Sequence, residues 1–132
     1  MKWGKRQPQS IDTKEIIPDW PEYVVSLNAS TFNDFIHTYP LSIIDFWAPW
    51  CAPCRTMYPR IRRVTKLYVG TIAFGRLNTQ QYPDIAKEYH IMSIPALLCF
   101  HRGKKVNEST GVKSIGALKT LAEDLLQTYN TE

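Results

Sequence analysis

The stretch from Phe46 to Arg55 constrains the fold of this chain more than any other part of the sequence. An apolar run ends in two cysteines, Cys51 and Cys54, and a helical pattern follows from Arg55. In this arrangement the first cysteine lies at a helix N-terminus, where unpaired N–H groups and the helix dipole favour a thiolate over a thiol. The pattern therefore predicts a redox nucleophile with a partner thiol three positions further on.

The cysteine count limits where such chemistry takes place. The chain holds three cysteines, a small and odd number, so it is not a scaffold stapled by disulfides. We therefore interpret Cys51 and Cys54 as one reactive pair and Cys99 as a lone thiol. Sparse cysteines are typical of proteins in reducing compartments, and we expect a cytoplasmic location.

Length and composition fit a soluble globular protein. The chain has 132 residues, of which 44% are hydrophobic and 21% are charged, enough for one domain with a hydrophobic core. No apolar segment approaches the ~18 residues that a membrane span needs, and no apolar segment of a secretory signal follows the basic N-terminus. The formal net charge is +4 without a basic run interleaved with aromatic residues, so we expect no nucleic-acid partner and no membrane partner.

Alternating apolar runs and helical patterns predict the secondary structure of the chain. The predicted strands cover Tyr23–Leu27, Leu41–Ala48, Thr71–Leu77, Ile91–Phe100 and Lys105–Thr110. The predicted helices cover residues 28–39, 51–68, 83–89 and 114–129, with Asn28 as the first N-cap. In the second helix Ile61, Val64 and Leu67 form the expected apolar stripe, and Pro59 predicts a kink.

The order of these elements predicts an α/β fold. The early alternation of strands and helices implies parallel strands, and the late hairpin implies an antiparallel edge. We therefore expect a central mixed five-stranded sheet with helices on both faces. Residues 1–21 are expected to form a basic and polar N-terminal extension, and residues 22–132 the domain.

Asp45 interrupts the most apolar of the predicted strands. A carboxylate inside a buried strand is costly unless it is paired, hydrogen-bonded or protonated. One interpretation is a structural acid whose partner is a hydroxyl or Arg76. The other is a proton acceptor for the buried thiol. We favour the second, because Asp45 lies six residues before Cys51 near the end of the same strand.

Further motifs lie around the cysteine pair. Residues 45–51 read Asp-Phe-Trp-Ala-Pro-Trp-Cys, Pro59 follows in the helix, Ile94-Pro95 opens a later apolar run and Gly111 follows the hairpin. With these motifs, residues 23–129 resemble the thioredoxin family. Residues 45–51 match the family's approach to its active site, and Pro59 matches its kinking proline. Ile94-Pro95 matches the position where the family carries a cis-proline that faces the cysteines.

The resemblance implies a thioredoxin fold and a role for each site residue. Cys51 is the exposed attacking thiolate, Cys54 is the buried resolving thiol, and Asp45 exchanges a proton with Cys54. The residues that shape the rim and bind the substrate backbone are Trp50, Pro53, Ile94, Pro95 and Gly111.

The resemblance also implies the activity. The chain is expected to be a protein-disulfide reductase that acts as a monomer on disulfide-containing client proteins. It needs no cofactor beyond its own cysteine pair, and a thioredoxin reductase or an equivalent donor supplies its electrons.

Three positions depart from the family pattern. Ala52 replaces the usual glycine between the cysteines, Arg76 replaces a lysine near the buried acid, and Ser93 replaces a common glycine before Ile-Pro. An arginine that reaches Asp45 favours the carboxylate, because its charge is permanent. We therefore expect Ala52 and Arg76 to modulate the chemistry of the site.

Other interpretations of the same residues remain at this stage. The fold also suits a disulfide oxidase or isomerase, or a binding module in which the thiols are incidental. A metal site is a further alternative, because Cys51, Cys54, Cys99 and His101 offer four ligands. We expect no metal, since Cys99 lies in an apolar strand where a free cysteine packs well.

Overall fold

The computed structural model describes residues 19–129, and residues 1–18 and 130–132 lie outside the described part. The strands are β1 (Val25–Leu27), β2 (Leu41–Trp47), β3 (Ala73–Asn78), β4 (Ala96–His101) and β5 (Lys104–Thr110). The helices are α2 (Phe32–Thr38), α3 (Ala52–Thr65), α4 (Pro83–Glu88) and α5 (Ile115–Tyr129). Most of the predicted N-terminal extension, including its basic residues, therefore lies outside the described residues.

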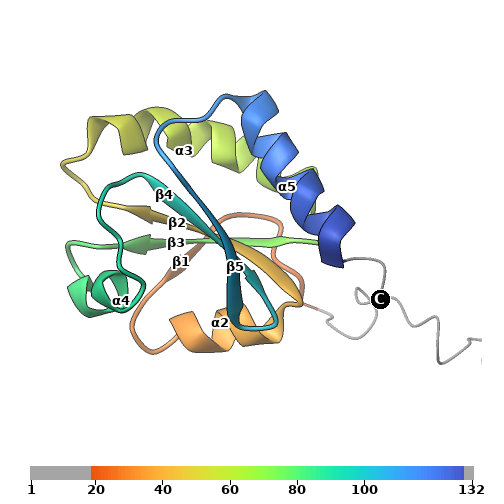
Figure 1. The fold of residues 1–132 in the computed structure, drawn as a ribbon, viewed down its shortest axis with the longest axis horizontal. Helices are drawn as coiled ribbons and strands as arrows, with labels where there is room; N and C mark the ends of the chain where they lie inside the picture. The colour runs from red at the N-terminus through yellow and green to blue at the C-terminus, as the bar shows by residue number, and fades with distance from the viewer. Residues whose placement is uncertain (1–18, 130–132) are drawn as a thin grey trace, which may run out of the picture.

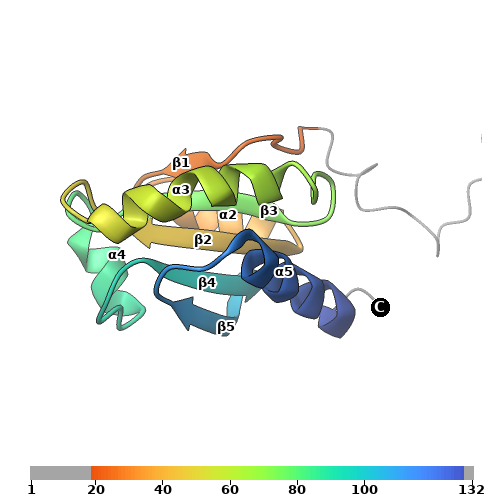
Figure 2. The same cartoon turned by 90° about the horizontal axis from the view of Figure 1, so that it is seen from above.

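One mixed sheet organises the molecule. Its strand order is β1-β3-β2-β4-β5, in which β1, β3 and β2 run parallel and β4 and β5 pair antiparallel. Helices α3 and α5 cover one face, and α2 and α4 lie on the other (Figures 1 and 2). Parallel connections are right-handed, so the step from β1 to β2 and the reverse step from β2 to β3 put α2 and α3 on opposite faces. The predicted α/β fold with a mixed five-stranded sheet is confirmed.

Strand β2 is the central strand and supplies both cores. Leu41 and Ile43 pack with α3 and α5 in one cluster, whereas Ile44 and Phe46 pack in the cluster on the α2 side. Alternate side chains of a strand point to opposite faces. Asp45 therefore belongs to the face that α3 covers, together with Ile43.

Several element boundaries differ from the sequence prediction. Strand β4 begins at Ala96 instead of Ile91, because residues 91–95 form a loop that contains the cis Ile94–Pro95 bond. Helix α2 begins at Phe32 with Thr31 as its N-cap. Asn28 is not the N-cap, because its side-chain oxygen accepts hydrogen bonds from the Ser30 and Thr31 N–H groups in a turn before the helix.

The predicted apolar stripe of the second helix is wrong at Leu67. Helix α3 ends at Thr65, so Leu67 lies in the following turn and is exposed. Tyr68 is buried instead, and its hydroxyl donates a hydrogen bond of 2.8 Å to Glu123 of α5. The stripe still holds at Ile61 and Val64, which are buried.

The described start of the chain packs on the domain. The Trp20 ring meets the Tyr39 ring edge-on, with their centroids 4.9 Å apart. Edge-to-face pairs of this kind are favourable because ring edges are positive and ring faces negative. Within residues 19–129 no helix combines the length and hydropathy that crossing a membrane requires.

Candidate active site

The connection between β2 and α3 positions the cysteine pair. Cys51 is the N-cap of α3, with an extended backbone (φ −90°, ψ 103°), and Pro53 lies in the first turn. A proline is favoured there because the first helical residues have no intrahelical partner for an N–H group. The Cys51 N–H group donates to the Ala48 carbonyl at 3.1 Å, which closes the turn before the helix.

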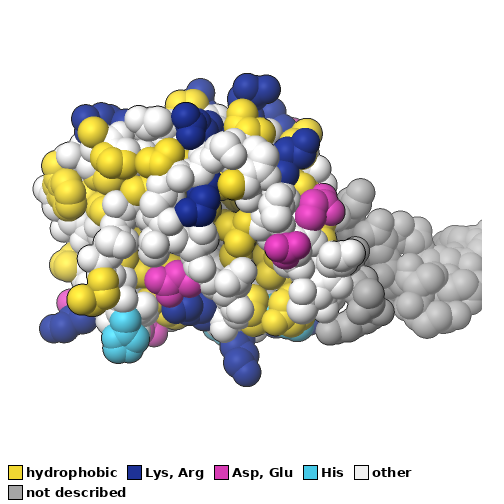
Figure 3. Space-filling model, turned by 45° about the horizontal axis from the view of Figure 1, so that its top comes forward, with side chains coloured by type: hydrophobic (Ala, Val, Ile, Leu, Met, Phe, Trp, Pro, Cys, Tyr) yellow, Lys and Arg dark blue, Asp and Glu magenta, His cyan; other side chains and the backbone are white. Residues whose placement is uncertain are grey.

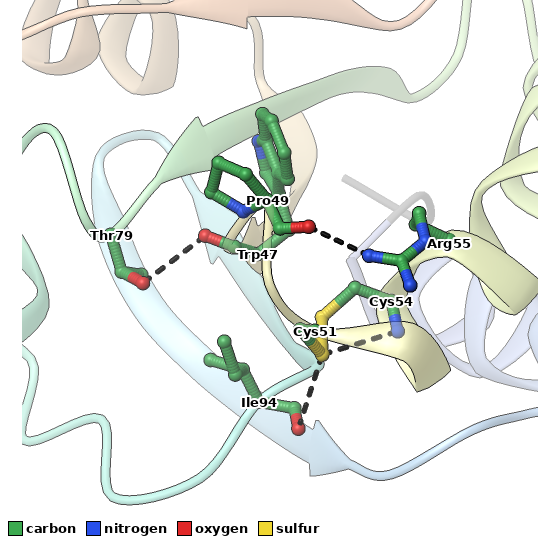
Figure 4. Close-up of a disulfide and its surroundings, with 7 residues drawn as sticks. All are labelled: Trp47, Pro49, Cys51, Cys54, Arg55, Thr79 and Ile94. Atoms are coloured by element: carbon green, nitrogen blue, oxygen red, sulfur yellow. Dashed lines mark hydrogen bonds between the residues drawn. A yellow bond between two sulfur atoms is a disulfide. The ribbon is translucent and has the colours of Figure 1, made fainter.

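Two side chains fix this connection from either side (Figure 4). The Thr79 hydroxyl and backbone N–H both donate to the Trp47 carbonyl, at 3.1 and 2.8 Å. On the helix side, the Arg55 guanidinium donates to the Pro49 carbonyl at 2.7 Å. The segment that presents the sulfurs is thus held to the loop after β3 and to the first turn of α3.

Cys51 and Cys54 form a disulfide, and their Cα atoms are 5.3 Å apart. The Cys51 sulfur accepts a hydrogen bond of 3.2 Å from the Cys54 N–H group, and it lies 3.9 Å from the Ile94 carbonyl oxygen (Figure 4). A helix N-terminus with an N–H group directed at a sulfur stabilises negative charge on that sulfur. This arrangement suits Cys51 for the thiolate role.

Exposure does not separate the two cysteines in this disulfide state. Cys51 is 3% exposed and Cys54 is 1% exposed, so the exposed position implied for Cys51 is not seen here. The difference between them lies in their surroundings: Cys51 caps the helix, whereas Cys54 lies inside its first turn.

Asp45 lies in the core without a direct partner. Its side chain is 1% exposed, and neither carboxylate oxygen has a hydrogen-bond partner among the described residues. Burial raises the pKa of Asp45 to about 7, and the charge of Arg76 opposes this shift less strongly. The described residues therefore offer Asp45 neither the hydroxyl nor the direct Arg76 contact that a structural acid would need. A carboxyl that titrates near neutral pH is suited to proton transfer.

Arg76 is held by aromatic rings instead of by Asp45. Its guanidinium carbon lies 3.9 Å from the centroid of the Trp47 ring and 3.7 Å from that of the Tyr58 ring. Cation–π contacts at such distances are favourable, and a guanidinium stacks well on aromatic faces. Tyr58 was absent from the sequence prediction. Its spacing of four residues from Cys54, which places both on one face of the helix, is the signal that could have found it.

Exposed apolar side chains lie in the segments that lead to the disulfide and to the Ile94–Pro95 loop. Trp50 is 68% exposed and Met92 is 93% exposed, and Val112 is also exposed. Figure 3 shows hydrophobic side chains gathered at the end of the molecule where β2 leads into α3. Exposed apolar patches of this kind mark interaction sites. Met92 is thus a rim residue, and Val112 was missed because a single valine after a glycine carries no sequence signal.

The other predicted substrate-binding residues lie in the segments next to the disulfide, where Pro95 is buried. Pro53 and Ala52 are exposed at the start of α3, and Ile94 is half-buried beside the Cys51 sulfur. The Gly111 N–H group donates to the Pro95 carbonyl at 2.9 Å, which joins the end of β5 to this loop. Gly111 has φ +88°, a conformation that glycine adopts without strain.

The four proposed metal ligands do not form a site. Cys99 is fully buried in β4, where it pairs with Ile43, and burial raises the pKa of its thiol to about 12. The His101 ring stacks on the Tyr129 ring with centroids 4.3 Å apart. Within residues 19–129 no three His, Cys, Asp or Glu side chains come together as metal ligands.

A family model and several curated proteins match this chain. The family model "Thioredoxin" matches residues 23–124. A thioredoxin from Griffithsia pacifica is 37% identical over 103 residues, which cover 77% of this chain and 94% of that protein. One from Synechocystis is 34% identical over 99 residues, which cover 75% of this chain and 92% of that protein.

A third relative is longer than this chain. The chloroplastic M-type thioredoxin from Spinacia oleracea is 39% identical over 89 residues, which cover 67% of this chain. The match spans 49% of that protein, or about half of its length.

Solved structures agree with the fold. A mutant thioredoxin from Halobacterium salinarum superimposes with a TM-score of 0.74, covering 80% of this chain and 93% of that chain. At 23% sequence identity this match shows the fold alone. A chain with 27% identity and a TM-score of 0.71 comes from a study of thiol resolution in yeast mitochondrial 1-Cys peroxiredoxin, and it is covered completely by 80% of this chain.

Proposed function

This chain belongs to the thioredoxin family and is a protein thiol–disulfide oxidoreductase, and from this premise we propose how its residues divide the reaction. The observation that carries the division is the position of Cys51 at the N-cap of α3, with the Cys54 N–H group on its sulfur. Helix N-termini lower thiol pKa values, so the first cysteine is the nucleophile of the reduced protein.

In the first step Cys51 forms a mixed disulfide with the client. The Cys51 thiolate attacks one sulfur of a client disulfide, a bond forms between the two sulfurs, and the second client sulfur leaves as a thiolate. The apolar rim of Trp50 and Met92 supports docking of a client segment, and the Ile94 carbonyl lies beside the attacking sulfur. We assign Trp50, Pro53, Ile94, Pro95 and Gly111 to client binding.

The second step releases the client. The Cys54 thiol gives up its proton and attacks the Cys51 sulfur of the mixed disulfide. The Cys51–Cys54 disulfide forms, and the remaining client sulfur leaves and takes up a proton. We propose that Asp45 accepts the proton of Cys54, and its raised pKa of about 7 and its place beneath α3 support this role. Overall the client gains two electrons and the cysteine pair loses two.

The partners and location complete the proposal. Members of the thioredoxin family act on disulfide-containing clients and are reduced by a thioredoxin reductase. We propose a reductase of this kind as the electron donor, a monomer as the working form and the cytoplasm as the location. The small number of cysteines supports a reducing compartment. Cell fractionation with an antibody to the chain tests the location, and recovery with organelles only contradicts it.

A trapping experiment tests the division of roles. The Cys54→Ser variant lacks the resolving thiol, so we expect it to accumulate mixed disulfides between Cys51 and an oxidised client such as insulin. The Cys51→Ser, Cys54→Ser double variant is the matched control and is expected to trap nothing. Mass spectrometry of the trapped species identifies the bonded cysteine. Trapping through Cys99, or none with any oxidised client, overturns the assignment.

A further inference from the structure

The guanidinium of Arg76 lies between two aromatic side chains from different elements. Trp47 comes from the end of β2 and Tyr58 from the middle of α3, and their ring centroids are 3.9 and 3.7 Å from the guanidinium carbon. Tyr58 also lies near a second cation, since the Arg62 guanidinium carbon is 5.3 Å from its ring centroid. The Arg76 Nε atom is buried and has no hydrogen-bond partner among the described residues. The two rings thus hold a cation that hydrogen bonds do not fully satisfy.

The same cation is the strand neighbour of the buried acid. In the parallel register of β2 and β3, Asp45 is directly opposite Arg76. Residues in register on neighbouring strands project from the same face, and here that face is the one covered by α3. Even so, no hydrogen bond or ion pair within residues 19–129 joins the two side chains, and both Asp45 oxygens stay without a partner.

An arginine beside a buried carboxylate normally forms a direct pair. The bidentate geometry of guanidinium and carboxylate makes such pairs short and strong, and burial strengthens them further. The absence of that pair here has a visible physical cause, because the guanidinium is already stacked on Trp47 and Tyr58.

We propose that Tyr58 is a positioning residue that, together with Trp47, clamps Arg76 near Asp45 without letting the two charges pair. The clamp keeps the carboxyl free to exchange a proton, whereas a direct ion pair fixes it as a carboxylate. The consequence for catalysis rests on the proton-acceptor role of Asp45 proposed above. The clamp itself does not depend on that role.

Within residues 19–129, one charged side chain acts on Asp45. Strand β4 places apolar Leu97 opposite Asp45, and apolar Ile43 and half-buried Trp47 flank it on its own strand face. On α3, the Tyr58 ring packs on Arg76 with Arg62 beyond that ring, and Cys54 is disulfide-bonded and carries no charge. Arg76 of β3 is the charged group that influences the pKa of Asp45.

A matched pair of substitutions tests the clamp. Tyr58→Leu keeps apolar bulk over the site and removes the aromatic face, whereas Tyr58→Phe keeps the face and removes only the hydroxyl. The measurement is the pKa of Asp45 in the full-length disulfide form, from the pH titration of its carboxyl carbon by NMR. We expect Tyr58→Leu to lower that pKa by about 1 unit or more, because the freed Arg76 pairs with the carboxylate. Tyr58→Phe is expected to leave the pKa close to that of the parent protein.

A second background shows whether the effect passes through Arg76. In an Arg76→Gln protein the same Tyr58→Leu substitution is expected to move the pKa of Asp45 less than half as far. An unchanged pKa in Tyr58→Leu overturns the clamp. An equal shift with and without Arg76 also overturns it, because altered burial then explains the result.

The pH profile of client reduction separates the clamp from the proposed function. If Asp45 accepts the proton of Cys54, the acid limb of the profile moves to lower pH in Tyr58→Leu, in the same direction as the NMR titration. If the NMR pKa moves and the profile does not, the clamp stands and the proton-acceptor role of Asp45 is overturned.

Discussion

The two faces of strand β2 differ in the polar group that each one buries. The α2 face holds the neutral Ser42 hydroxyl and the α3 face the ionisable Asp45 carboxyl, and neither has a hydrogen-bond partner among the described residues. On the α2 face, Phe46 packs in an aromatic cluster, with ring centroids 6.0 Å from Phe32 and 6.4 Å from Tyr89. Tyr89 in turn meets Phe100 at 5.5 Å, nearly perpendicular. Every one of these contacts is an edge-on or tilted aromatic pair, which favours a stable and closely packed interior.

The α3 face of the same strand buries an ionisable group in addition to its apolar core. Asp45 has no direct partner among the described residues, and its strand neighbour Arg76 is stacked on aromatic rings. Burying an unpaired carboxylate costs more free energy than burying an unpaired hydroxyl, so this face loses more stability than the other. The difference teaches that one central strand carries the fold on one side and the chemistry on the other.

Removing the nucleophile on the α3 side gives the sharpest test of this division. We expect Cys51→Ser to abolish client reduction, because a serine hydroxyl is not ionised at neutral pH. Its unfolding midpoint is expected to stay close to that of the reduced parent protein, since the substitution exchanges one atom. Insulin reduction with a coupled donor measures the activity, and retained turnover in Cys51→Ser contradicts the assignment.

Truncation on the α2 side is expected to do the reverse. Phe46→Ala removes a fully buried ring and leaves a cavity, which costs about 3–5 kcal/mol of unfolding free energy. Urea unfolding measures the loss. In the fraction that remains folded, the pH profile of client reduction is expected to match that of the parent protein. A shifted profile shows that the two faces are coupled and contradicts the division between a structural and a chemical face.

The sequence predicts the fold and the redox pair well because their signals are local. A continuous apolar run marks β2 as central, and two cysteines at a helix start need no distant information. The loop at residues 91–95 is different. Its apolar composition indicates a strand, and the contacts that define it come from Gly111 and from the Cys51 sulfur, which lie far away in sequence.

The setting of Arg76 is also beyond the reach of sequence reasoning. The resemblance predicts a role for Arg76 because it replaces the family's lysine near the buried acid, and the prediction is that it acts directly on Asp45. The observed stack needs the register of β2 against β3 and the rotation of α3 above them, because Trp47 and Tyr58 come from separate elements. Residue patterns predict each element separately, but they do not predict that Trp47, Tyr58 and Arg76 come into contact.

Replacing Asp45 tests, through the free energy of unfolding, what the buried acid costs the α3 face of β2. The pKa of Asp45 is about 7 in the folded protein and 3.8 for an ordinary Asp. The unfolded chain therefore loses its proton first, and the stability of the parent protein falls as pH rises from about 4 to about 7. Asp45→Asn has no such loss, so we expect it to be more stable by about 4 kcal/mol above pH 7 and nearly equal near pH 4.

Urea unfolding of both proteins at pH 4 and pH 8 measures this difference. An equal difference at the two pH values contradicts the raised pKa. The same variant is expected to resolve mixed disulfides more slowly, and unchanged kinetics across neutral pH contradict its role as a proton acceptor. If the α3 face carries the chemistry at a cost in stability, Asp45→Asn gains stability and loses rate.

The smallest effect is expected at Cys99, the cysteine that lies on the α3 face outside the redox site. Its thiol is fully buried in the core, and burial raises its pKa to about 12, so it stays protonated and inert at neutral pH. We expect Cys99→Ala to cost about 1 kcal/mol of unfolding free energy, from the loss of one buried sulfur. Client reduction is expected to be unchanged, which insulin turnover measures. Lower turnover in Cys99→Ala would show that packing beneath α3, and not only the cysteine pair and Asp45, contributes to the reaction.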